Sequence, residues 1–316
     1  MKLIIQIPCL NEEATLPAVL KTIPKKIDGI DEITTLIIDD GSTDKTIEVA
    51  KKHGVKHFVI HSKNMGLARS FHDGIHYALS IGADIVVNTD GDNQYPQEQI
   101  SDLVQPILRG EAEIVIGDRQ TSTIEHFSPI KKLFQRVGSS VVNKAAGTSL
   151  PDAASGFRAY SKQSLLRLNI VTQFSYCMET IIQAGNKRIP ITSVKIKTNP
   201  KTRESRLFKN IWQHMYKSGS AISRSYIMYR PHLIFITLGG LLLIAGLIPF
   251  VRYGYIYITG NHGGDHIQSL LLGAVLIFAS MIAFALTVIA DLTHTNRTLL
   301  EDSLERIKEL QYNDND

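Results

Sequence analysis

The chain has 316 residues, a formal net charge of +4 and two cysteines. Its length allows one sizeable soluble domain and a further segment, because domains usually span roughly 50–250 residues. The modest charge does not indicate nucleic-acid binding, and Cys9 and Cys177 are too few and too far apart for a disulfide framework or a zinc site.

Apolar runs alternate with segments of helical period along the N-terminal part of the chain. Strands are expected at 3–7, 33–38, 55–60, 85–87 and 113–116, and helices at 15–22, 46–52, 67–81 and 97–108. Strands separated by helices of this length need right-handed crossovers. The sequence therefore predicts an α/β fold with a mostly parallel sheet and helices on both faces. The first run stops at Pro8 without a cleavage site, so we expect a strand there and no signal peptide.

Two acidic clusters each follow a predicted buried strand. They are Asp39-Asp40-Gly41-Ser42 and Asp90-Gly91-Asp92-Asn93-Gln94. In a parallel α/β sheet, ligands bind in the crevice outside the carboxyl ends of the strands, so both clusters should face one cleft. Mg²⁺ prefers one or two carboxylates together with substrate phosphate oxygens. The Asp-x-Asp spacing of Asp90 and Asp92 therefore predicts a diphosphate-metal site.

Ordinary helix capping is the alternative interpretation of these loops. Asn11 could cap the first helix, with Glu12 as a first-turn acid, and Ser42 or Thr43 could cap the next one. Capping requires one polar residue and does not explain two consecutive acids before a glycine. We therefore favour contact of Asp39 with a nucleobase or ribose.

The composition changes abruptly to nearly pure hydrocarbon at 233–250 and at 267–290. Each run approaches the roughly 20 apolar residues that cross a bilayer, and a buried helical hairpin in a soluble protein is the alternative. Nine Lys and Arg residues lie between Lys195 and Arg230 against one acid, Glu204, whereas the loop between the runs holds only Arg252. Flanking cations are retained on the cytoplasmic side, so the N-terminal domain and the tail are expected in the cytoplasm.

The predicted organisation has four parts. Residues 1–200 form the catalytic α/β domain, 201–231 form amphipathic interfacial helices, 232–291 form two transmembrane helices, and 292–316 form a cytoplasmic tail. Cations interleaved with apolar and aromatic residues in the second part are typical of helices that lie in the membrane plane. The tail repeats leucine and isoleucine at helical spacing and could be an oligomer-forming helix.

Six motifs occur in the order of a known family. They are Pro8-x-x-Asn11-Glu12, Asp39-Asp40-Gly41-Ser42, Asn64-x-Gly66, Asp90-x-Asp92-x-Gln94, Gly117-Asp118-Arg119 and Asp152-x-x-Ser155-Gly156-Phe157-Arg158. With these motifs the chain resembles the inverting GT-A-type, family 2 glycosyltransferases that make polyprenyl-phosphate sugars, such as dolichyl-phosphate mannosyltransferases and bactoprenol glucosyltransferases. Tyr229-Arg230-Pro231 before a two-span hairpin is similar to the bactoprenol branch.

The resemblance assigns the donor side of the site. The residues it places around the nucleoside are Pro8, Leu10, Glu12, Ile37 and Asp39. Asp90 and Asp92 would hold Mg²⁺ or Mn²⁺ against the diphosphate, and Gln94 would complete the coordination, with a solvated loop amide as the alternative. Gly91 has no side chain, so backbone there can approach the donor closely.

The acceptor side needs cations, because a phosphate monoester carries about −1.5 to −2 charge near neutral pH. By resemblance, Arg119 and Arg136 would meet the acceptor phosphate, and an arginine fork suits that task. Asp152 stands where the family has its candidate catalytic base. The acceptor phosphate is already ionised, so we expect Asp152 to orient groups and stabilise charge more than to remove a proton.

Many relatives carry an Arg where Pro200 stands and a Lys where Arg206 stands. By resemblance, Arg203 would replace the missing cation over the donor diphosphate, with Arg206 assisting, although the position of Arg203 is offset from that of the Arg. A juxtamembrane basic patch that binds lipid headgroups is the alternative interpretation.

The sequence and the resemblance together predict transfer of a hexose to undecaprenyl phosphate at the cytoplasmic membrane face, with inversion at the anomeric carbon. We favour glucose from UDP-glucose, and mannose from GDP-mannose is the alternative. A processive polysaccharide synthase would carry Gln-x-x-Arg-Trp, which the chain lacks. A nucleotide-sugar sensor without turnover is a further alternative. The resemblance also implies a homo-oligomer, with a tetramer suspected.

Overall fold

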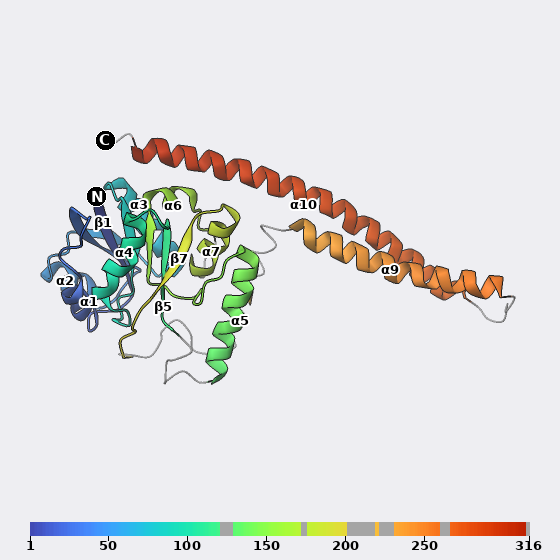
Figure 1. Ribbon diagram of the computed structural model, residues 1–316, viewed down its shortest axis with the longest axis horizontal. Coiled ribbons are helices and arrows are strands. Elements are labelled where there is room, and N and C mark those ends of the chain that lie inside the picture. The colour runs from blue at the N-terminus through green and yellow to red at the C-terminus, as the bar shows by residue number, and fades with distance from the viewer. Residues whose placement is uncertain (121–128, 172–175, 201–218, 221–230, 260–265, 314–316) are drawn as a thin grey trace. The chain divides into compact units, whose positions relative to one another are not determined.

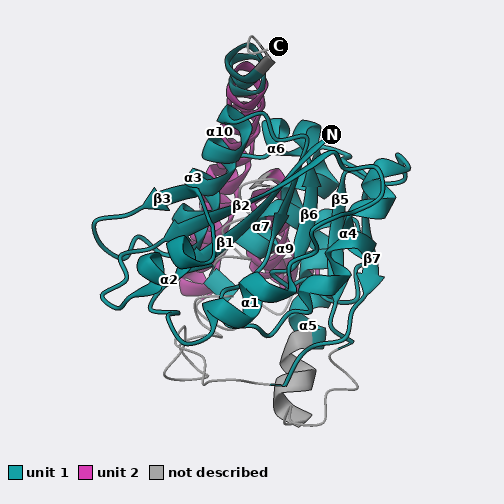
Figure 2. Cartoon of the chain, turned by 90° about the vertical axis from the view of Figure 1, so that its left-hand side faces the viewer, with its two compact units in different colours: residues 1–223, 304–316 teal, residues 224–303 magenta. Residues whose placement is uncertain are grey.

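The structure is a computed structural model that describes residues 1–120, 129–171, 176–200, 219–220, 231–259 and 266–313, with 129–135 described by their backbone. The chain forms two compact units (Figure 2). Unit 1 comprises residues 1–223 and 304–316, and unit 2 comprises residues 224–303.

Unit 1 is built on the sheet that contains β1, β5 and β7 in Figure 1. This sheet has seven strands in the order β3-β2-β1-β4-β6-β5-β7. The strands are β1 (Lys2–Cys9), β2 (Glu32–Asp39), β3 (His57–Ile60), β4 (Ile85–Asn88), β5 (Ile114–Asp118), β6 (Arg158–Ser161) and β7 (Ile191–Lys195). The pairs β1–β2, β1–β4, β2–β3 and β5–β7 are parallel. The predicted α/β class with a mostly parallel sheet is confirmed.

Strand β6 is antiparallel to both of its neighbours. Asn88 of β4 and Ile116 of β5 both pair with Arg158, the first residue of β6. The start of an antiparallel strand meets the ends of its neighbours, so the loop that leads into β6 lies at the carboxyl ends of β4 and β5. This insertion brings a third loop to the edge of the sheet where parallel α/β proteins bind ligands.

Helices cover both faces of the sheet. They are α1 (Leu16–Thr22), α2 (Thr46–Lys52), α3 (Leu67–Ser80), η1 (Gln97–Gln99), α4 (Ile100–Leu108), α5 (Pro129–Ala146), α6 (Lys162–Arg167) and α7 (Tyr176–Asn186).

One core cluster joins alternate strand residues such as Ile5 and Ile7 to Leu16 of α1 and Leu103 of α4. On α3, Phe71 stacks on Tyr176 of α7 with ring centroids 3.8 Å apart. Phe71 also meets Tyr160 of β6, so the sheet carries apolar contacts to α3 and α7 as well. The strands are buried on both faces of the sheet, and for this reason their sequences are continuous apolar runs.

Unit 2 contains α9 (Pro231–Ile258) and the first part of α10 (Ile267–Asn313). Both helices are long and apolar enough to cross a membrane, and their most apolar windows are 11% and 17% buried. They pack closely at glycines. A Cβ on Gly273 would lie 2.8 Å from the carbonyl oxygen of Gly246, and Ser280 Oγ donates to the carbonyl of Gly239 over 2.8 Å. Small residues at this interface let the two backbones approach each other, as in membrane helix pairs.

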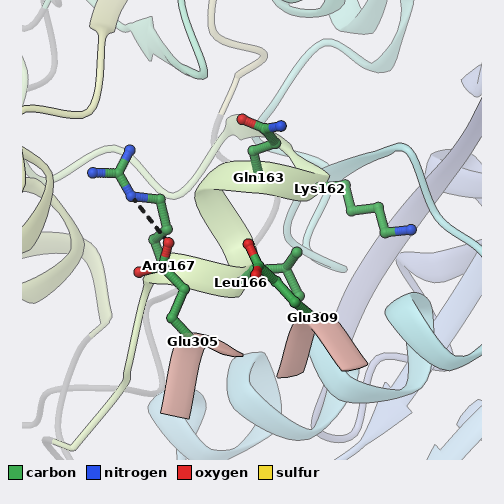
Figure 3. A pocket seen from close by; sticks show the side chains of 6 residues that line it. All are labelled: Lys162, Gln163, Leu166, Arg167, Glu305 and Glu309. Carbon is green, nitrogen blue, oxygen red and sulfur yellow. Dashed lines mark ion pairs between the residues drawn. The ribbon is translucent and has the colours of Figure 1, made fainter. Parts of the chain in front are cut away.

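The last turns of α10 belong to unit 1, and Glu305 there pairs with Arg167 of α6 at 3.7 Å (Figure 3). Lys308 Nζ donates to the carbonyl of Leu168 and to Asn169 Oδ1, both at 2.8 Å. Tyr312 is 5% exposed, and its hydroxyl lies 2.7 Å from His76 Nδ1 on α3. The C-terminal turns are thus held on the α/β unit mainly by polar contacts.

Candidate active site

The first two loops of the candidate site are fastened to each other at the carboxyl ends of β1 and β2. Asn11, with a φ of 56°, donates its backbone N–H to Ser42 Oγ over 2.8 Å, and its Oδ1 accepts the N–H of Thr43 over 2.7 Å. The N–H of Glu12 donates to Thr46 Oγ1 over 2.8 Å. Asn11 therefore ties the loop after β1 to the loop after β2, and the two loops form one rigid edge.

Asp39 and Asp40 have different surroundings. Asp39 is 2% exposed, and its Oδ2 accepts the N–H of Ser42 over 3.2 Å. Its Oδ1 is buried and has no hydrogen-bond partner among the described residues. A buried acceptor without a donor is costly, so this oxygen suits a ligand N–H or O–H.

Asp40 instead organises the loop after β3. Its carboxylate accepts the N–H groups of Met65 and Gly66 over 2.8 and 2.9 Å, and His61 Nδ1 lies 2.8 Å from its Oδ1. Gly41 has a φ of 80°, and a Cβ there would lie 2.6 Å from the carbonyl carbon of Lys63. The two consecutive acids thus differ, since Asp39 keeps a buried oxygen without a partner among the described residues and Asp40 fixes a neighbouring loop.

The other residues assigned to the nucleoside differ in exposure. Pro8 and Leu10 are half-buried at the end of β1, and Glu12 is 5% exposed. Ile37, a residue of β2, is completely buried in the core cluster. The structure brings Pro8, Leu10 and Glu12 to the site edge, whereas direct contact of Ile37 with a ligand stays a prediction.

The acidic loop after β4 lies against the loop after β1. A Cβ on Gly91 would lie 3.1 Å from Cys9 Sγ and 3.2 Å from Glu12 Cγ, so a glycine fits this close approach. Thr15 Oγ1 donates to the carbonyl of Gly91 over 2.8 Å. Gln94 donates its side-chain amide to Asp92 Oδ2 over 2.7 Å, and its N–H to Oδ1 over 3.1 Å. In the structure, Gln94 therefore orients Asp92.

Asp90 and Asp92 make a donor set that a divalent cation could use. Within the described part of the chain, no three His, Cys, Asp or Glu side chains gather as a metal-binding group. Two carboxylates without a third protein acid suit Mg²⁺ or Mn²⁺, which would take its other ligands from phosphate oxygens and water. These residues fit a metal that is completed by its substrate better than a closed structural site.

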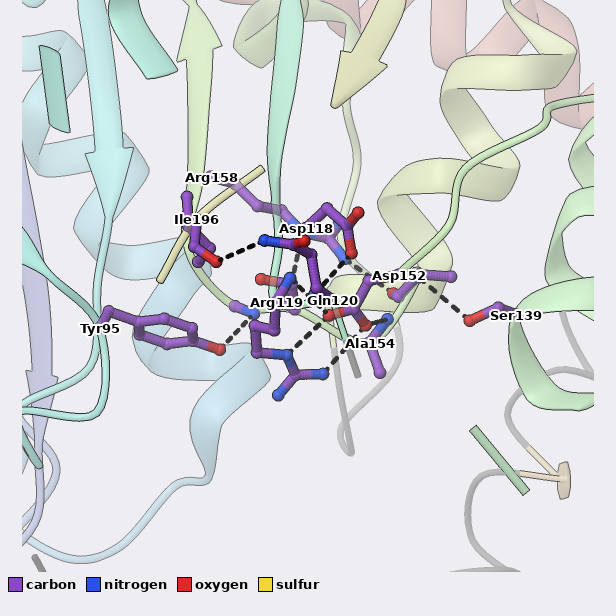
Figure 4. Close-up of polar contacts among 12 residues, drawn as sticks. Tyr95, Asp118, Arg119, Gln120, Ser139, Asp152, Ala154, Arg158 and Ile196 are labelled. Carbon is purple, nitrogen blue, oxygen red and sulfur yellow. Dashed lines mark hydrogen bonds and ion pairs between the residues drawn. The ribbon is translucent and has the colours of Figure 1, made fainter. Parts of the chain in front are cut away.

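Arg119, directly after β5, and Asp152 form a buried bidentate ion pair (Figure 4). Arg119 Nε lies 2.7 Å from Asp152 Oδ2, and Nη2 lies 3.0 Å from Oδ1. The two side chains are 18% and 2% exposed. The parallel fork is the geometry in which an arginine–carboxylate pair is strongest.

This pairing decides the protonation state of Asp152. Burial alone would raise the pKa of Asp152, but the charge of Arg119 and the hydrogen bonds it donates outweigh burial and hold that pKa below its usual value. The carboxylate is therefore ionised and engaged near neutral pH. A general base should have a pKa near the working pH, so this environment fits orientation of Arg119 better than proton removal.

The loop from Ala153 to Gly156 is fixed by side chains that the sequence analysis left without a role. The foremost is Arg158, which is fully buried. Its guanidinium donates to the carbonyls of Ala153, Ser155 and Cys177 and to Thr180 Oγ1, at 2.7 to 2.9 Å. The signal available in the sequence was the place of this arginine at the end of the motif that begins with Asp152. Its partners could not be read from the sequence.

Arg136 lies exposed on α5. Three residues further along the same helix, Ser139 Oγ accepts the N–H of Ala153 over 3.2 Å. The structure thus ties α5 to the loop of Asp152, while contact of Arg136 with a phosphate stays a prediction. Arg203 and Arg206 lie outside the described residues, as does most of the predicted interfacial segment.

Comparison with known proteins gives one family. The family model described as "Glycosyl transferase family 2" matches residues 4–168. UDP-N-acetylglucosamine–dolichyl-phosphate N-acetylglucosaminyltransferase of Methanococcus voltae is 29% identical over 61% of this chain and 83% of its own length. Dolichyl-phosphate hexose transferase of Haloferax volcanii is 26% identical, over 69% and 89%. Undecaprenyl-phosphate mannosyltransferase of Micrococcus luteus is 26% identical, over 54% and 70%.

Among solved structures, glucosyl-3-phosphoglycerate synthase from Mycobacterium tuberculosis has a similar fold. Its complex with Mn²⁺, uridine-diphosphate-glucose and phosphoglyceric acid gives a TM-score of 0.54 at 22% identity, covering 72% of this chain and 78% of that one. Its complex with Mg²⁺ and uridine-diphosphate gives a TM-score of 0.52 at 21% identity, with the same 72% and 78% coverage. This likeness supports the GT-A fold.

Proposed function

Since the chain belongs to glycosyl transferase family 2, we propose that it is a membrane-bound hexosyltransferase that moves a sugar from a nucleotide donor to a polyprenyl phosphate. Three relatives are named for dolichyl-phosphate or undecaprenyl-phosphate as the acceptor, while their sugars differ. The comparisons therefore support the acceptor class more strongly than the sugar.

One observation carries the proposal. The loop of Asp90 and the loop of Asp152 meet at Gly156, where a Cβ would lie 3.5 Å from Asp90 Oδ2. An acidic loop suited to a metal diphosphate and an arginine suited to a second phosphate are thus neighbours at one edge of the sheet. Such an arrangement can hold two anionic substrates close together, which their mutual repulsion would otherwise oppose.

On the donor side, we propose that Asp39 Oδ1 accepts a hydrogen bond from the nucleoside. Pro8, Leu10, Glu12 and Ile37 would complete its surroundings, with Gly91 backbone against the donor. Asp90 and Asp92, with Gln94, would hold Mg²⁺ or Mn²⁺. When bound, the metal neutralises charge on the departing nucleoside diphosphate. The structural relatives that bind Mn²⁺ or Mg²⁺ with UDP support this assignment.

On the acceptor side, Arg119 and Arg136 would hold the phosphate, and Arg203 and Arg206 would lie over the donor diphosphate. An oxygen of the acceptor phosphate attacks the anomeric carbon from the face opposite the leaving group. The new C–O bond forms as the bond to the nucleoside diphosphate breaks, and the leaving group departs with that electron pair. The anomeric configuration inverts, and no proton has to be removed.

Asp152 then acts through Arg119. Its ionised carboxylate holds the guanidinium in a fixed orientation beside the acceptor position, with the two groups joined at 2.7 and 3.0 Å. A negative charge at this place also favours the positive charge that develops on the sugar ring in the transition state. We therefore assign Asp152 to orientation and charge stabilisation.

Helices α9 and α10 would anchor the enzyme. The core helix of a soluble protein is mostly buried, whereas the apolar windows of these helices are 11% and 17% buried. We propose that both cross the cytoplasmic membrane and that the catalytic domain, residues 1–200, faces the cytoplasm. Residues 201–231 would lie at the interface. The exposed side chains of Leu299, Leu304 and Ile307 support the expectation that copies of the chain associate.

A transfer assay tests the proposal. Purified full-length protein in detergent is supplied with undecaprenyl phosphate, Mg²⁺ or Mn²⁺, and one of UDP-glucose, UDP-galactose, UDP-N-acetylglucosamine or GDP-mannose. The lipid product is identified by mass. We expect undecaprenyl-phosphate glucose as the product with UDP-glucose. A lipid product formed only when GDP-mannose is the donor would favour the alternative donor. Nucleotide-sugar binding without any lipid product would favour a sensor instead of an enzyme.

A further inference from the structure

Tyr95 joins the acidic loop after β4 to the loop of Asp152. It follows Gln94 directly, is 4% exposed, and its hydroxyl accepts the N–H of Gly156 over 2.9 Å. Its ring stacks on Phe157, with centroids 5.2 Å apart and planes 13° from parallel. Figure 4 shows the tyrosine directed at the cluster that contains Arg119 and Asp152.

The other side of the same glycine is also held. Asn88, the last residue of β4, donates its amide to the carbonyl of Gly156 over 3.0 Å and to the hydroxyl of Tyr176 over 2.7 Å. The Tyr176 hydroxyl in turn donates to the Gly156 carbonyl over 3.2 Å. Both polar groups of Gly156 are therefore bonded to side chains, and Tyr95 is the one that comes from the loop of Asp92.

The rest of the Asp152 loop has little freedom to adjust. Arg158 fixes the carbonyls of Ala153 and Ser155, and Asp152 Oδ1 accepts the N–H of Ala154 over 3.3 Å. The tyrosine backbone is fixed as well, because Asn199 Nδ2 donates to the carbonyls of Asn93 and Tyr95 over 3.0 and 3.3 Å. The Tyr95 hydroxyl thus links two loops that are each held by further hydrogen bonds.

We propose that Tyr95 is a positioning residue, whose hydroxyl sets the spacing between the donor-metal loop and the Asp152–Arg119 pair through the N–H of Gly156. This inference rests on the proposed function, since it concerns the distance between the two phosphate-bearing substrates. In this proposal the hydroxyl acts through the Gly156 N–H and not on a substrate. It fixes the geometry of in-line attack, in which a displacement of about 1 Å can lower the rate about 100-fold.

Replacing Tyr95 by Phe tests the inference, because it removes the hydroxyl and keeps the stacked ring. We expect kcat for sugar transfer to fall about 10- to 100-fold, with the donor KM and the nucleoside diphosphate affinity in Mg²⁺ within about twofold of wild type. Tyr77→Phe is the matched control. Its hydroxyl lies 3.1 Å from His57 Nδ1, away from both loops, and its kinetics should equal those of wild type.

An unchanged kcat in Tyr95→Phe overturns the inference. A lower kcat together with a higher donor KM and a weaker nucleotide affinity also overturns it, because that result would indicate general damage to the site. Melting temperatures identify a variant that fails to fold. In that case Tyr176→Phe, which loosens the same peptide from its carbonyl side, should lower kcat about 3- to 10-fold at constant donor KM. Wild-type protein that transfers no sugar from any donor refutes the proposed function itself.

Discussion

Replacing Asp152 by Asn removes one negative charge from a buried ion pair while keeping the size of the side chain. Asp152 is 2% exposed and Arg119 is 18% exposed, so the variant leaves a largely buried guanidinium without its counter-charge. Removing one partner of a buried pair costs about 3–5 kcal/mol. Because Arg119 retains some exposure, we expect the free energy of unfolding to fall by about 3 kcal/mol, at the lower end of this range.

An exposed pair of the same geometry provides the control. Arg109 contacts Glu111 through two hydrogen bonds of 2.6 and 3.0 Å, and both side chains are more than half exposed. Solvent screens such a pair, so Glu111→Gln should leave the unfolding midpoint in urea unchanged. A similar loss in both variants would show that burial does not determine the strength of the Arg119–Asp152 pair.

The pH dependence follows from the lowered pKa of Asp152. The stabilisation from this pair is fully present above the unfolded carboxyl pKa of about 3.9 and is lost as the pH falls through the still lower folded pKa. The difference in unfolding free energy between wild type and Asp152→Asn should therefore be constant near neutral pH and shrink in acid. A difference that grew on acidification would contradict the assigned direction.

A double variant, Asp152→Asn with Arg119→Gln, should regain stability without regaining activity. We expect Asp152→Asn to lower transfer at least about 100-fold. Adding Arg119→Gln removes the unpaired charge, so most of the lost stability should return, while transfer stays low. The acid limb of the wild-type rate should follow the acceptor phosphate near pH 6, and residual activity of Asp152→Asn should keep that limb. Near-normal transfer by Asp152→Asn would refute the orientation role.

Three further outcomes follow from the structure. Asp92→Ala and chelation by excess EDTA should each abolish lipid glycosylation while the protein remains folded and in the membrane fraction; full turnover in chelator would count against the metal. Gly185→Ala should lower the melting temperature at a cost of about 1–3 kcal/mol or more, because the new Cβ would clash with the carbonyl oxygen of Ala146 on α5. Gly138→Ala, with open space around it, should not destabilise. Burial, with the charges of neighbouring cations, lowers the pKa of His76 to about 4, so its neutral form favours the fold above about pH 6.5 and this contribution is lost towards pH 4. The hydrogen-exchange protection factors of residues 304–313, corrected for the intrinsic exchange rate at each pH, should fall as the pH is lowered over that interval. A His76→Gln variant should lose this pH dependence.

Local sequence pattern was sufficient for the elements of the α/β domain up to β5. Apolar runs and helical periods depend on neighbours in the chain, so the strands that lead into Pro8, Asp39 and Asp90 could be located without tertiary information. The acidic ends of β2 and β4 also indicated that their loops share one edge of the sheet, because parallel strands place their carboxyl ends together. The pattern did not separate the roles of Asp39 and Asp40, since burial and loop contacts decide which acid is left with an unpartnered oxygen.

The amino-acid sequence alone determined an α/β domain of the glycosyltransferase type, its acidic loops, and two apolar helices of membrane length. Tertiary structure alone decided that β6 enters antiparallel between β4 and β5, which brings Asp152 to Arg119, 33 residues away in the chain, and Gly156 to Tyr95, 61 residues away. The period of apolar residues depends only on residues close together in the chain, so it predicts helices and strands. Contacts between residues far apart in the chain depend instead on strand order and on which buried polar groups find hydrogen-bond partners.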